Sequence, residues 1–370
     1  MASTDRGQQP RRRARHEGGG TREAAVTIKD VAKTAGVSTA TVSRVLTGGG
    51  SRVSSATCRR VLRTAQELGY RPHRGARALV RQRSGVIGML LVRFGNDFVG
   101  GIMDGLASAA RDSGREALFA SYGADGPNGL RQALDHLLET RPEGIVLYPA
   151  TSLPIEDLDL VAELERVPTV LVDLAVDGLD LPLVTTDDAD GVRQGVDHLV
   201  SMGHARIAHL AGPSWTSTGM ARLRGFREAM AAHGLRVPEN WLVRYDFSYV
   251  QAVTATQRLL QTRPLPSAII AADDRGAAAL LDVARHAGVR VPDDLSVIGF
   301  SDLELSRVCH PPLTTVRQPR EELGMEAVRL LVALIEGDTS TAYRGAHLLP
   351  TQLCIRGSCG PPAGQQEAPM

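Results

Sequence analysis

Residues 26–46 have the sequence VTIKDVAKTAGVSTATVSRVL, which predicts two short helices joined by a tight turn. Thr27 followed three residues later by the acidic Asp30 is the pattern of a capping box, which starts a helix. Gly36 is placed to end that helix, and Ser38 is placed to start the next one. Helix, glycine turn and helix together predict a helix-turn-helix unit.

A third helix is predicted on the C-terminal side of a loop with three glycines at residues 48–50. Ser54 is placed to cap this helix, and Pro72 stops it. The apolar residues at helical spacing along it are Val61, Leu62, Ala65 and Leu68. Residues 26–72 are therefore expected to form a small all-α domain.

Basic residues are concentrated at the N-terminal end, although the whole chain of 370 residues has a net charge of only +1. Residues 1–83 contain 18 basic and 5 acidic side chains, a net charge of +13. Residues 84–370 contain 24 basic and 36 acidic side chains, a net charge of −12. Residues 26–83 alone keep 12 basic and 2 acidic side chains, or +10. This asymmetry predicts a nucleic-acid-binding module on an acidic body.

The second helix of such a unit lies in the major groove with its N-terminal residues facing base edges. Thr39 and Ala40 offer a hydroxyl and methyl groups, and Arg44 offers paired donors that match guanine. Ser38, Thr41 and Ser43 suit phosphate oxygens, which position the module without reading sequence. A plain three-helix bundle with a polar face is the alternative, and the basic surplus disfavours it.

Residues 85–356 alternate between short apolar runs and amphipathic stretches, which predicts repeated βα units with parallel sheets covered on both faces. The predicted strands are 85–92, 116–120, 144–147, 169–172, 183–185, 206–210, 267–271 and 295–298. Helical patterns cover 101–111, 130–139, 192–200 and 276–286. This length is large for one sheet, so two doubly wound subdomains with a cleft between them are expected.

Several other classes of protein are disfavoured by the sequence. No apolar stretch approaches the length of a membrane span, and the basic N-terminus lacks the apolar core of a secretory signal. The four cysteines show no CxxC spacing, which argues against a zinc or redox site. No nucleophile elbow, phosphate loop or zinc-protease motif is present, and the histidines are scattered, so we expect no enzyme, no metal and no cofactor.

The sequence resembles the LacI/GalR family of bacterial transcription regulators over about residues 26–356. The helix-turn-helix stretch and the following RVSSATCRRVLRTAQELGYRP resemble the family's DNA-binding domain. HLVSMGHARIAHLAGP, ARLRGFREAM, VPDDLSVIGFSDLELS and PPLTTVRQP resemble its ligand-sensing core, in the same order and spacing. The resemblance implies a periplasmic-binding-protein-like core of two subdomains behind the helix-turn-helix domain.

The resemblance further implies a homodimer on a palindromic DNA operator and a hinge helix, matched here by residues 74–80. In the family a leucine from each subunit enters the minor groove, and Leu79 matches it, with Ala76 beside it. Gly75 would weaken this helix, and the loop at 47–51 is about one residue longer than usual. The candidate DNA-binding residues are Thr27, Ser38, Thr39, Ala40, Thr41, Ser43, Arg44, Arg52, Ser54, Thr57, Ala76 and Leu79.

The candidate ligand-binding residues follow from chemistry and from the resemblance. A sugar or polyol is gripped by planar charged groups that pair with neighbouring hydroxyls, and by an aromatic face. Arg222 and Asp274 match the family's ligand-binding arginine and aspartate, and Asp273 stands where asparagine is usual. Phe247 matches a stacking aromatic, whereas Asn96 and Phe98 match a loop whose proline and second phenylalanine are missing here. Asp187 and Asp173 end other strands and complete the candidates.

The expected function is that of a ligand-responsive repressor, cytoplasmic and associated with the nucleoid, with a small polar effector in the cleft. Two alternatives were an enzyme with a DNA tether and an architectural DNA-binding protein with a vestigial cleft. The C-terminal stretch has no heptad, so a dimer is expected rather than a tetramer. The expected divisions are a disordered basic tail at 1–25, the DNA-binding domain at 26–72, a hinge at 73–84, the core at 85–356, and a disordered tail at 357–370.

Overall fold

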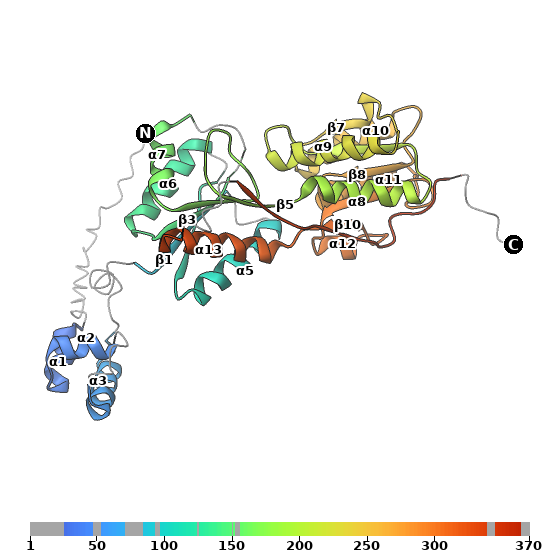
Figure 1. Cartoon of the computed structure of the whole chain (residues 1–370). Helices are drawn as coiled ribbons and strands as arrows, with labels where there is room; N and C mark the ends of the chain where they lie inside the picture. Colours follow the sequence, from blue (N-terminus) through green and yellow to red (C-terminus); the bar gives the residue numbers. More distant parts are fainter. Residues whose placement is uncertain are drawn as a thin grey trace, which may run out of the picture. The chain divides into compact units, whose positions relative to one another are not determined.

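The computed structural model describes residues 26–46, 53–70, 84–92, 97–123, 126–149, 151, 156–338 and 345–363. The chain divides into two compact units, Met1–Gln82 and Arg83–Met370. Figure 1 shows the helices and strands of each unit, coloured along the sequence.

The first unit holds three short helices around a small apolar core, as predicted. They are α1 (Ile28–Ala35), α2 (Thr39–Leu46) and α3 (Ser55–Glu67). The buried apolar residues are Val31, Ala32, Ala35, Val42, Val61 and Ala65. Leu62, which was expected in this core, is 52% exposed. It lies about 100° around the helix from Val61, which is enough to turn its side chain to solvent.

The start of α1 has the hydrogen bonds that its sequence predicts. The carboxylate of Asp30 accepts from the Thr27 backbone N–H at 2.8 Å and from the Thr27 hydroxyl at 2.7 Å. Gly36 ends the helix with φ 63°, in the left-handed region that glycine adopts at no steric cost. The helix-turn-helix geometry therefore follows from residues that the sequence marks.

The second unit contains two parallel-sheet subdomains. The first sheet has the strand order β11-β5-β4-β3-β1-β2, and all its pairs are parallel. Its strands are β1 (Val86–Leu91), β2 (Glu116–Ser121), β3 (Gly144–Tyr148), β4 (Thr169–Val172), β5 (Leu183–Thr186) and β11 (Ala346–Leu349). Burial on both faces explains why the inner strands are continuous apolar runs.

The second sheet has the order β12-β10-β9-β8-β6-β7. Its strands are β6 (Ile207–Ala211), β7 (Leu242–Arg244), β8 (Ala268–Ala271), β9 (Ser296–Ser301), β10 (Thr314–Arg317) and β12 (Gln352–Cys354). The edge strand β12 pairs with β10 in antiparallel fashion. The prediction of purely parallel sheets is therefore wrong at this edge, because the chain returns to the sheet without a helical crossover.

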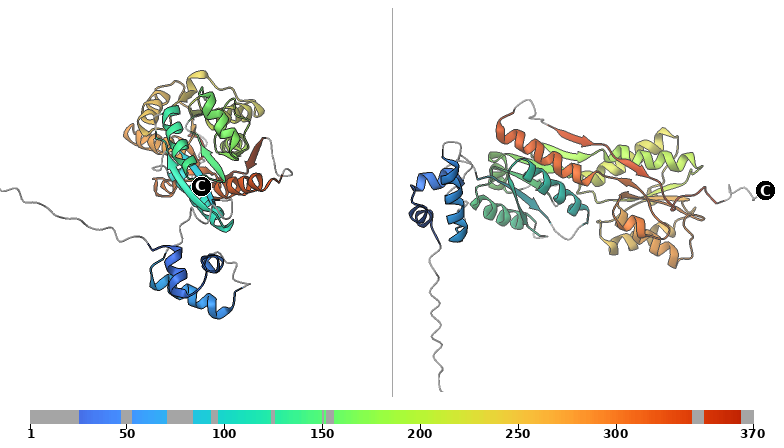
Figure 2. Two further views of the ribbon diagram at one scale, coloured as in Figure 1. Left: turned by 90° about the vertical axis from the view of Figure 1, so that its left-hand side faces the viewer. Right: turned by 90° about the horizontal axis from the view of Figure 1, so that it is seen from below.

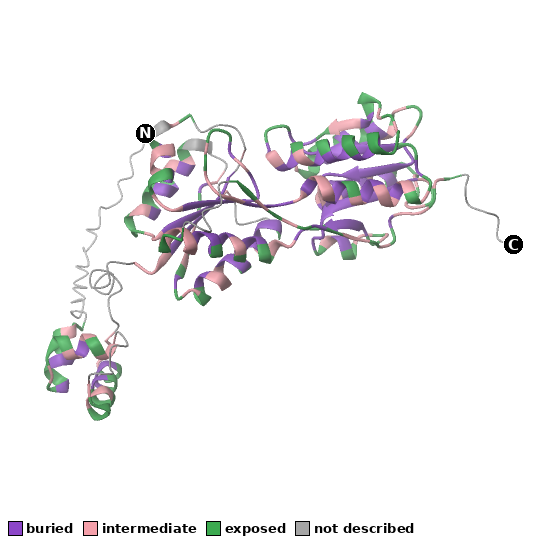
Figure 3. Cartoon of the chain, viewed as in Figure 1, coloured by how far each residue is buried: buried purple, intermediate pink, exposed green. Residues whose placement is uncertain are grey.

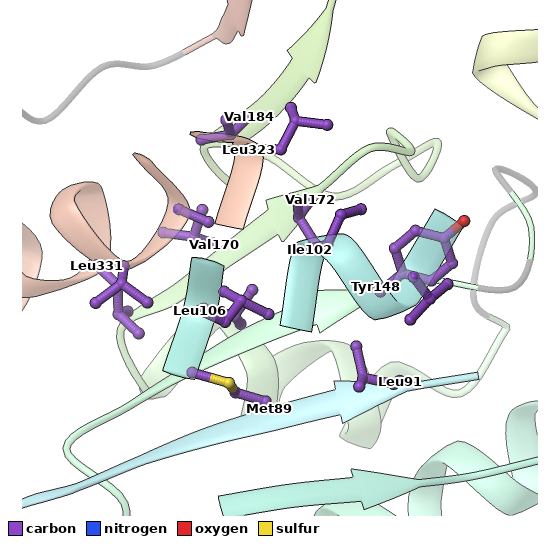
Figure 4. Packing of buried hydrophobic residues seen from close by; sticks show 14 of the residues in the cluster. Met89, Leu91, Ile102, Leu106, Tyr148, Val170, Val172, Val184, Leu323 and Leu331 are labelled. Carbon is purple, nitrogen blue, oxygen red and sulfur yellow. The ribbon is translucent and has the colours of Figure 1, made fainter. Parts of the chain in front are cut away.

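Helices cover both faces of both sheets. On the first sheet, α5 (Asp97–Asp112) and α13 (Arg320–Glu336) pack on one face, and α6 (Gly126–Glu139) and α7 (Leu158–Arg166) on the other. Figure 4 shows the first of these layers, where Ile102 and Leu106 of α5 lie between the strands and α13. On the second sheet, α8 (Asp188–Ser201) and α9 (Ser217–Ala232) lie opposite α10 (Tyr249–Leu260) and α11 (Asp274–His286). Figure 3 shows the strands buried and the outer helix surfaces exposed.

Within the described ranges the chain passes between the subdomains three times, at residues 186–188, 317–320 and 349–352. The α13 helix and β11, both late in the sequence, complete the first subdomain (Figure 2). Side chains tie the crossings together. Gln318 donates from Nε2 to the Thr186 hydroxyl at 2.8 Å, and Thr351 donates from Oγ1 to the Asp187 carbonyl at 3.3 Å.

The core extends past residue 356, where a disordered tail was expected to begin. The buried Ser358 hydroxyl donates to the Val297 carbonyl at 2.6 Å and accepts from the Thr314 N–H at 2.8 Å. Gly360 donates from its N–H to the Ser296 hydroxyl at 3.0 Å. Its composition suggested disorder, but small side chains let residues 357–360 lie against β9 and β10. The expected tail at 1–25, most of the hinge at 73–84, and residues 364–370 lie outside the described residues.

Four strands of the sheets are absent from the predicted set, namely β7, β10, β11 and β12. Each has only three or four residues, and three of them are edge strands. The fourth, β10, begins with two threonines that are fully buried and yet hydrogen-bonded. The remaining elements of the second unit are the single-turn η2 (Glu239–Trp241) and α12 (Leu305–Val308).

Candidate functional site

The N-terminal end of α2 presents to solvent the residues predicted to read bases. Thr39, Ala40 and Arg44 are exposed, whereas Thr41 and Ser43 are half-buried. The polar face of α2 that does not pack on the core is therefore free to enter a DNA groove, as a recognition helix requires. The contacts of these residues with DNA stay predictions.

Four hydroxyls among the candidate DNA-binding residues fix the starts of α2 and α3. Ser38 accepts from the Thr41 N–H at 3.1 Å, and Ser54 accepts from the Thr57 N–H at 3.3 Å. The two hydroxyls within each pair are 2.9 Å apart. These side chains therefore hold the helix ends in place whether or not they also contact DNA. Thr27 is exposed at the start of α1, and the candidates Arg52, Ala76 and Leu79 lie outside the described residues.

A cavity of about 450 Å³ lies between the two subdomains of the second unit. The first subdomain contributes Phe98, Tyr148 and Asp173 to its wall, among others, and the second contributes Arg222, Phe247 and Asp273. It meets strands β3, β4 and β9 at their carboxyl ends, where open α/β sheets bind ligands. Its size is that of an ordinary small-molecule site.

Arg222 on α9 is the buried cation of this cavity, with 4% of its surface exposed. It donates from Nη1 to the Ala272 carbonyl at 2.6 Å, and from Nη2 to Asp188 at 3.3 Å and Gln318 at 3.4 Å. Its guanidinium lies 4.0 Å from the centre of the Phe300 ring. The Nε–H has no protein partner. An arginine held this way keeps its plane fixed and has a donor to offer.

Two carboxylates near Arg222 are incompletely paired. Oδ1 of Asp173 and Oδ2 of Asp188 are buried without a hydrogen-bond partner. Burial, reinforced by repulsion from Asp188, raises the pKa of Asp173 to about 7, against the opposing effects of Arg222 and Tyr148. Burial is also the main reason that the pKa of Asp188 is raised. Buried polar atoms left open in this way are typical of ligand sites.

The two adjacent candidates Asp273 and Asp274 occupy different environments, and their order of importance differs from the prediction. Asp273 caps α11 and lines the cavity, and its Oδ1 accepts from Tyr245 at 2.5 Å and from the Gly276 N–H at 2.6 Å. Asp274 is fully buried behind the wall, where it accepts from Thr315 at 2.5 Å and from the Leu303 N–H at 2.7 Å. The matched aspartate therefore supports the fold, and its neighbour faces the ligand space.

Asp187 also differs from the prediction. It caps α8, accepting from the Asp190 N–H at 2.9 Å, and lines a separate cavity of about 130 Å³. Its side chain is used in the cap of the helix that follows its strand, and it is not among the residues that line the larger cavity. Asn96 lies outside the described residues.

Residues with unusual backbone conformations gather at the cavity wall. Asp173, Phe247 and Ser301 line it and have φ values of 70°, 63° and 116°, in the left-handed region. Such conformations cost energy in residues other than glycine and gather at functional sites. Phe247 contacts Tyr245 edge-on, with ring centres 5.6 Å apart. The predicted Phe98, Arg222, Phe247 and Asp273 thus meet in one cavity.

Sequence reasoning missed Tyr148, Ser301 and Gln318, which also line the cavity. Gln318 accepts from the Ser301 hydroxyl at 2.9 Å and from Arg222, while its amide donates to Thr186. It therefore connects the buried arginine to two of the chain crossings. Its signal in the sequence was its place in PPLTTVRQP, one of the stretches that resemble the family's ligand-sensing core, at the end of the short strand β10.

Comparison with known proteins gives a consistent picture over both units. A family model described as bacterial regulatory proteins, lacI family, matches residues 27–73, and one described as a periplasmic binding protein-like domain matches residues 196–359. The regulator CelR of Thermobifida fusca is 36% identical over 342 residues, covering 90% of this chain and 98% of the relative. The chain belongs to the lacI family of bacterial regulatory proteins.

Further relatives of this lacI-family protein are also regulators. The repressor PurR of Photobacterium profundum is 35% identical over 84% of this chain and 92% of its own length. Among solved structures, the Lac repressor dimer bound to operator and an anti-inducer has a TM-score of 0.81, with 30% identity over 91% of this chain and 100% of that one. A CelR–cellobiose complex has a TM-score of 0.68, with 33% identity over 90% and 99%.

These findings show that the chain is a DNA-binding transcriptional repressor of the lacI family, with a core that resembles periplasmic binding proteins. The predicted fold class is confirmed: a helix-turn-helix domain followed by a periplasmic-binding-protein-like core. Across the described ranges, no helix is both long and apolar enough to cross a lipid bilayer.

The raised pKa of Asp173 gives this lacI-family repressor a testable pH dependence. Its carboxyl binds a proton more tightly in the folded state than in the unfolded state, so its burial destabilises the unliganded protein increasingly as pH rises from about 4, and in full above about 7. Asp173→Asn is expected to stabilise the unliganded protein at pH 8 by on the order of 1–3 kcal/mol, and less at pH 5.

Urea unfolding of both proteins at the two pH values measures this difference. The exposed Asp177, four residues on in the same loop, supplies the matched control Asp177→Asn, which should change little. Asparagine tolerates the left-handed backbone as well as aspartate does, so the substitution adds no strain at this position. A variant no more stable than the parent at pH 8 would contradict the raised pKa.

Proposed function

We propose that this lacI-family repressor binds a palindromic operator as a homodimer, one helix-turn-helix domain to each half-site. A small polar effector, of the sugar or related metabolite class, occupies the cavity of the core and changes operator affinity. The protein acts in the cytoplasm, on the nucleoid, and is not an enzyme. The Lac repressor dimer solved on its operator and the CelR–cellobiose complex support the partners proposed here.

One observation carries the effector proposal. Arg222, which lines the cavity, is hydrogen-bonded to Gln318, and Gln318 is hydrogen-bonded to Thr186, so two chain crossings are linked directly to the cavity. A ligand that engages both walls favours one relative placement of the subdomains over another. It then shifts operator affinity by its differential affinity for the two conformations.

The operator part of the proposal is tested by selecting bound duplexes from a random DNA pool with the full-length protein. We expect a palindrome of about 14–20 base pairs with a flexible central pyrimidine–purine step. Binding that enriches no sequence and simply fades with salt would contradict it. That outcome would favour an architectural protein instead.

Arg44 provides a sharper test within the selected operator. Arg44→Ala is expected to cost about 1–3 kcal/mol of binding and to relax the preference at a guanine position, because a bidentate contact is lost. Arg63, exposed on α3, is the control: Arg63→Ala should leave the base preference unchanged. Repeating the selection with both variants measures the preference. An unchanged guanine position in Arg44→Ala would remove Arg44 from the base-reading set.

A further inference from the structure

The cavity wall of the first subdomain combines one carboxylate with two aromatic rings. Phe98 and Tyr148 are each only 9% exposed, and Asp173 is 5% exposed. The other described residues of this wall carry no charge, being apolar side chains such as Val92 and Leu174. A carboxylate beside aromatic rings in a water-poor site is the environment that favours a protonated amine.

The charges on the opposite wall do not neutralise Asp173. Arg222 interacts electrostatically with three carboxylates, Asp173, Asp188 and Asp273, and its ion pair is made with Asp188. Burial raises the pKa of Asp273, and Arg275, the second cation of the cavity, is among the groups that oppose this rise. Asp173 is therefore the lining carboxylate left with one unpartnered oxygen, and its charge is offset by a share of one arginine and by a hydrogen bond from Tyr148.

We propose that the effector of this repressor is a hydroxylated small molecule with a protonated amine, and that this amine binds Asp173 between Phe98 and Tyr148. An amino sugar is the simplest member of this class. The inference rests on the proposed function, in that it takes the cavity to be the effector site. Hydroxyls of the same molecule accept from the Nε–H of Arg222, which has no protein partner, and bind polar residues of the second subdomain.

Other ligand charges fit this wall less well. A neutral sugar donates hydrogen bonds to Asp173, but it then buries the carboxylate further without offsetting its charge. An acidic ligand adds a fourth carboxylate to a group of three that share Arg222. A protonated amine supplies both the missing donor and the missing charge in one group.

The proposal has a consequence in protons as well as in affinity. In the empty cavity Asp173 has a pKa of about 7, set by burial and by Asp188, against Arg222 and Tyr148. An adjacent ammonium group lowers that pKa, so amine binding near neutral pH releases a proton. A neutral ligand that only excludes water raises the pKa, so its binding takes a proton up. A hydroxyl that donates to the carboxylate also lowers its pKa, but less than a charged ammonium does, so an amino sugar is distinguished by releasing more protons than its neutral partner.

The experiment is calorimetry of the full-length protein at pH 7 with three matched sets of sugars, in two buffers of different ionisation enthalpy. The sets are glucose, glucosamine and glucuronate, and their galactose and mannose counterparts. We expect binding of at least one amino sugar with proton release, roughly 10-fold to 100-fold tighter than its neutral partner, as one charge-assisted bond provides. A neutral or acidic sugar that binds as tightly, or the absence of any amino-sugar binding, overturns the proposal.

Two variants locate the contact. Asp173→Asn is expected to lose the preference for the amine and the proton release, whereas Asp177→Asn on the exposed part of the same loop keeps both. An amine preference that survives in Asp173→Asn overturns the assignment to this residue. Operator binding is measured on the same proteins. If the unsubstituted chain does not bind an operator, the proposed repressor function is contradicted, but the calorimetric result for the cavity still stands.

Discussion

Replacing Arg222 by methionine is expected to abolish effector binding and to lower the free energy of unfolding by about 3–5 kcal/mol. Methionine has similar length and no charge, so Asp188 is left buried without Arg222, its only ion-pair partner among the described residues. The Ala272 carbonyl also loses its hydrogen-bond donor, and the Phe300 ring loses the guanidinium that lies over it. Urea unfolding at pH 7.5 measures the loss of stability, and calorimetry measures the loss of binding.

Two further variants separate charge from packing in this prediction. Arg224, on the same helix, is 68% exposed at its side chain, so Arg224→Met should cost well under 1 kcal/mol. Combining Arg222→Met with Asp188→Asn removes both charges and should restore much of the stability, but not the binding. An Arg222→Met protein that unfolds at the parent's urea concentration would show that the buried pair contributes nothing.

The second large effect is expected at Gly105, where α5 meets α13. A Cβ at Gly105 would lie 2.0 Å from the Glu321 carbonyl oxygen, and one at Gly324 would lie 2.2 Å from the Ile102 carbonyl oxygen. Backbone atoms cannot rotate away, so Gly105→Ala must push the two helices apart. We expect a loss of about 3 kcal/mol or more, at the upper end for an overpacked site.

Gly100 on the same helix is the matched control, since a Cβ there meets nothing within 4 Å. Gly100→Ala should stabilise the protein by roughly 0.5–1 kcal/mol, because alanine is the better helix former. Opposite signs at two glycines five residues apart would show that contact with α13, rather than helix propensity, determines the outcome. Thermal unfolding of the two variants provides the comparison, and equal effects would contradict the close approach.

The alternation of strands and helices could be predicted because the inner strands are buried on both faces. Runs such as that of β4 (Thr169–Val172) leave little choice but a covered strand. The edges could not be predicted, because β7 and β11 alternate or are too short to show a period. The C-terminal residues were misjudged for a related reason. Their order comes from side-chain-to-backbone hydrogen bonds around Ser358, which composition does not register.

The sequence could predict which residues belong to the site better than it could predict which way their side chains point. Arg222 and Phe247 were identified by resemblance, and both line the cavity. Of two adjacent carboxylates, however, the sequence cannot show which one the helix start turns inward. Asp273 keeps an extended backbone as the cap of α11, and Asp274 begins the helix and points into the core. Gln318 was missed because its role depends on crossings that only the folded chain brings together.

Neither sheet of the core is built from one continuous stretch of sequence, and this determines the order of events during synthesis. The first sheet lacks α13 and β11 until residue 349 has been made, and the second lacks β12 until residue 354. The three-helix domain is complete by residue 70, so it can fold on the ribosome long before either half of the core. A chain still being translated thus acquires its DNA-binding part first. It becomes responsive to an effector only after β11 and β12 have been made, so a chain ended before residue 346 would be a DNA-binding fragment that no ligand can control.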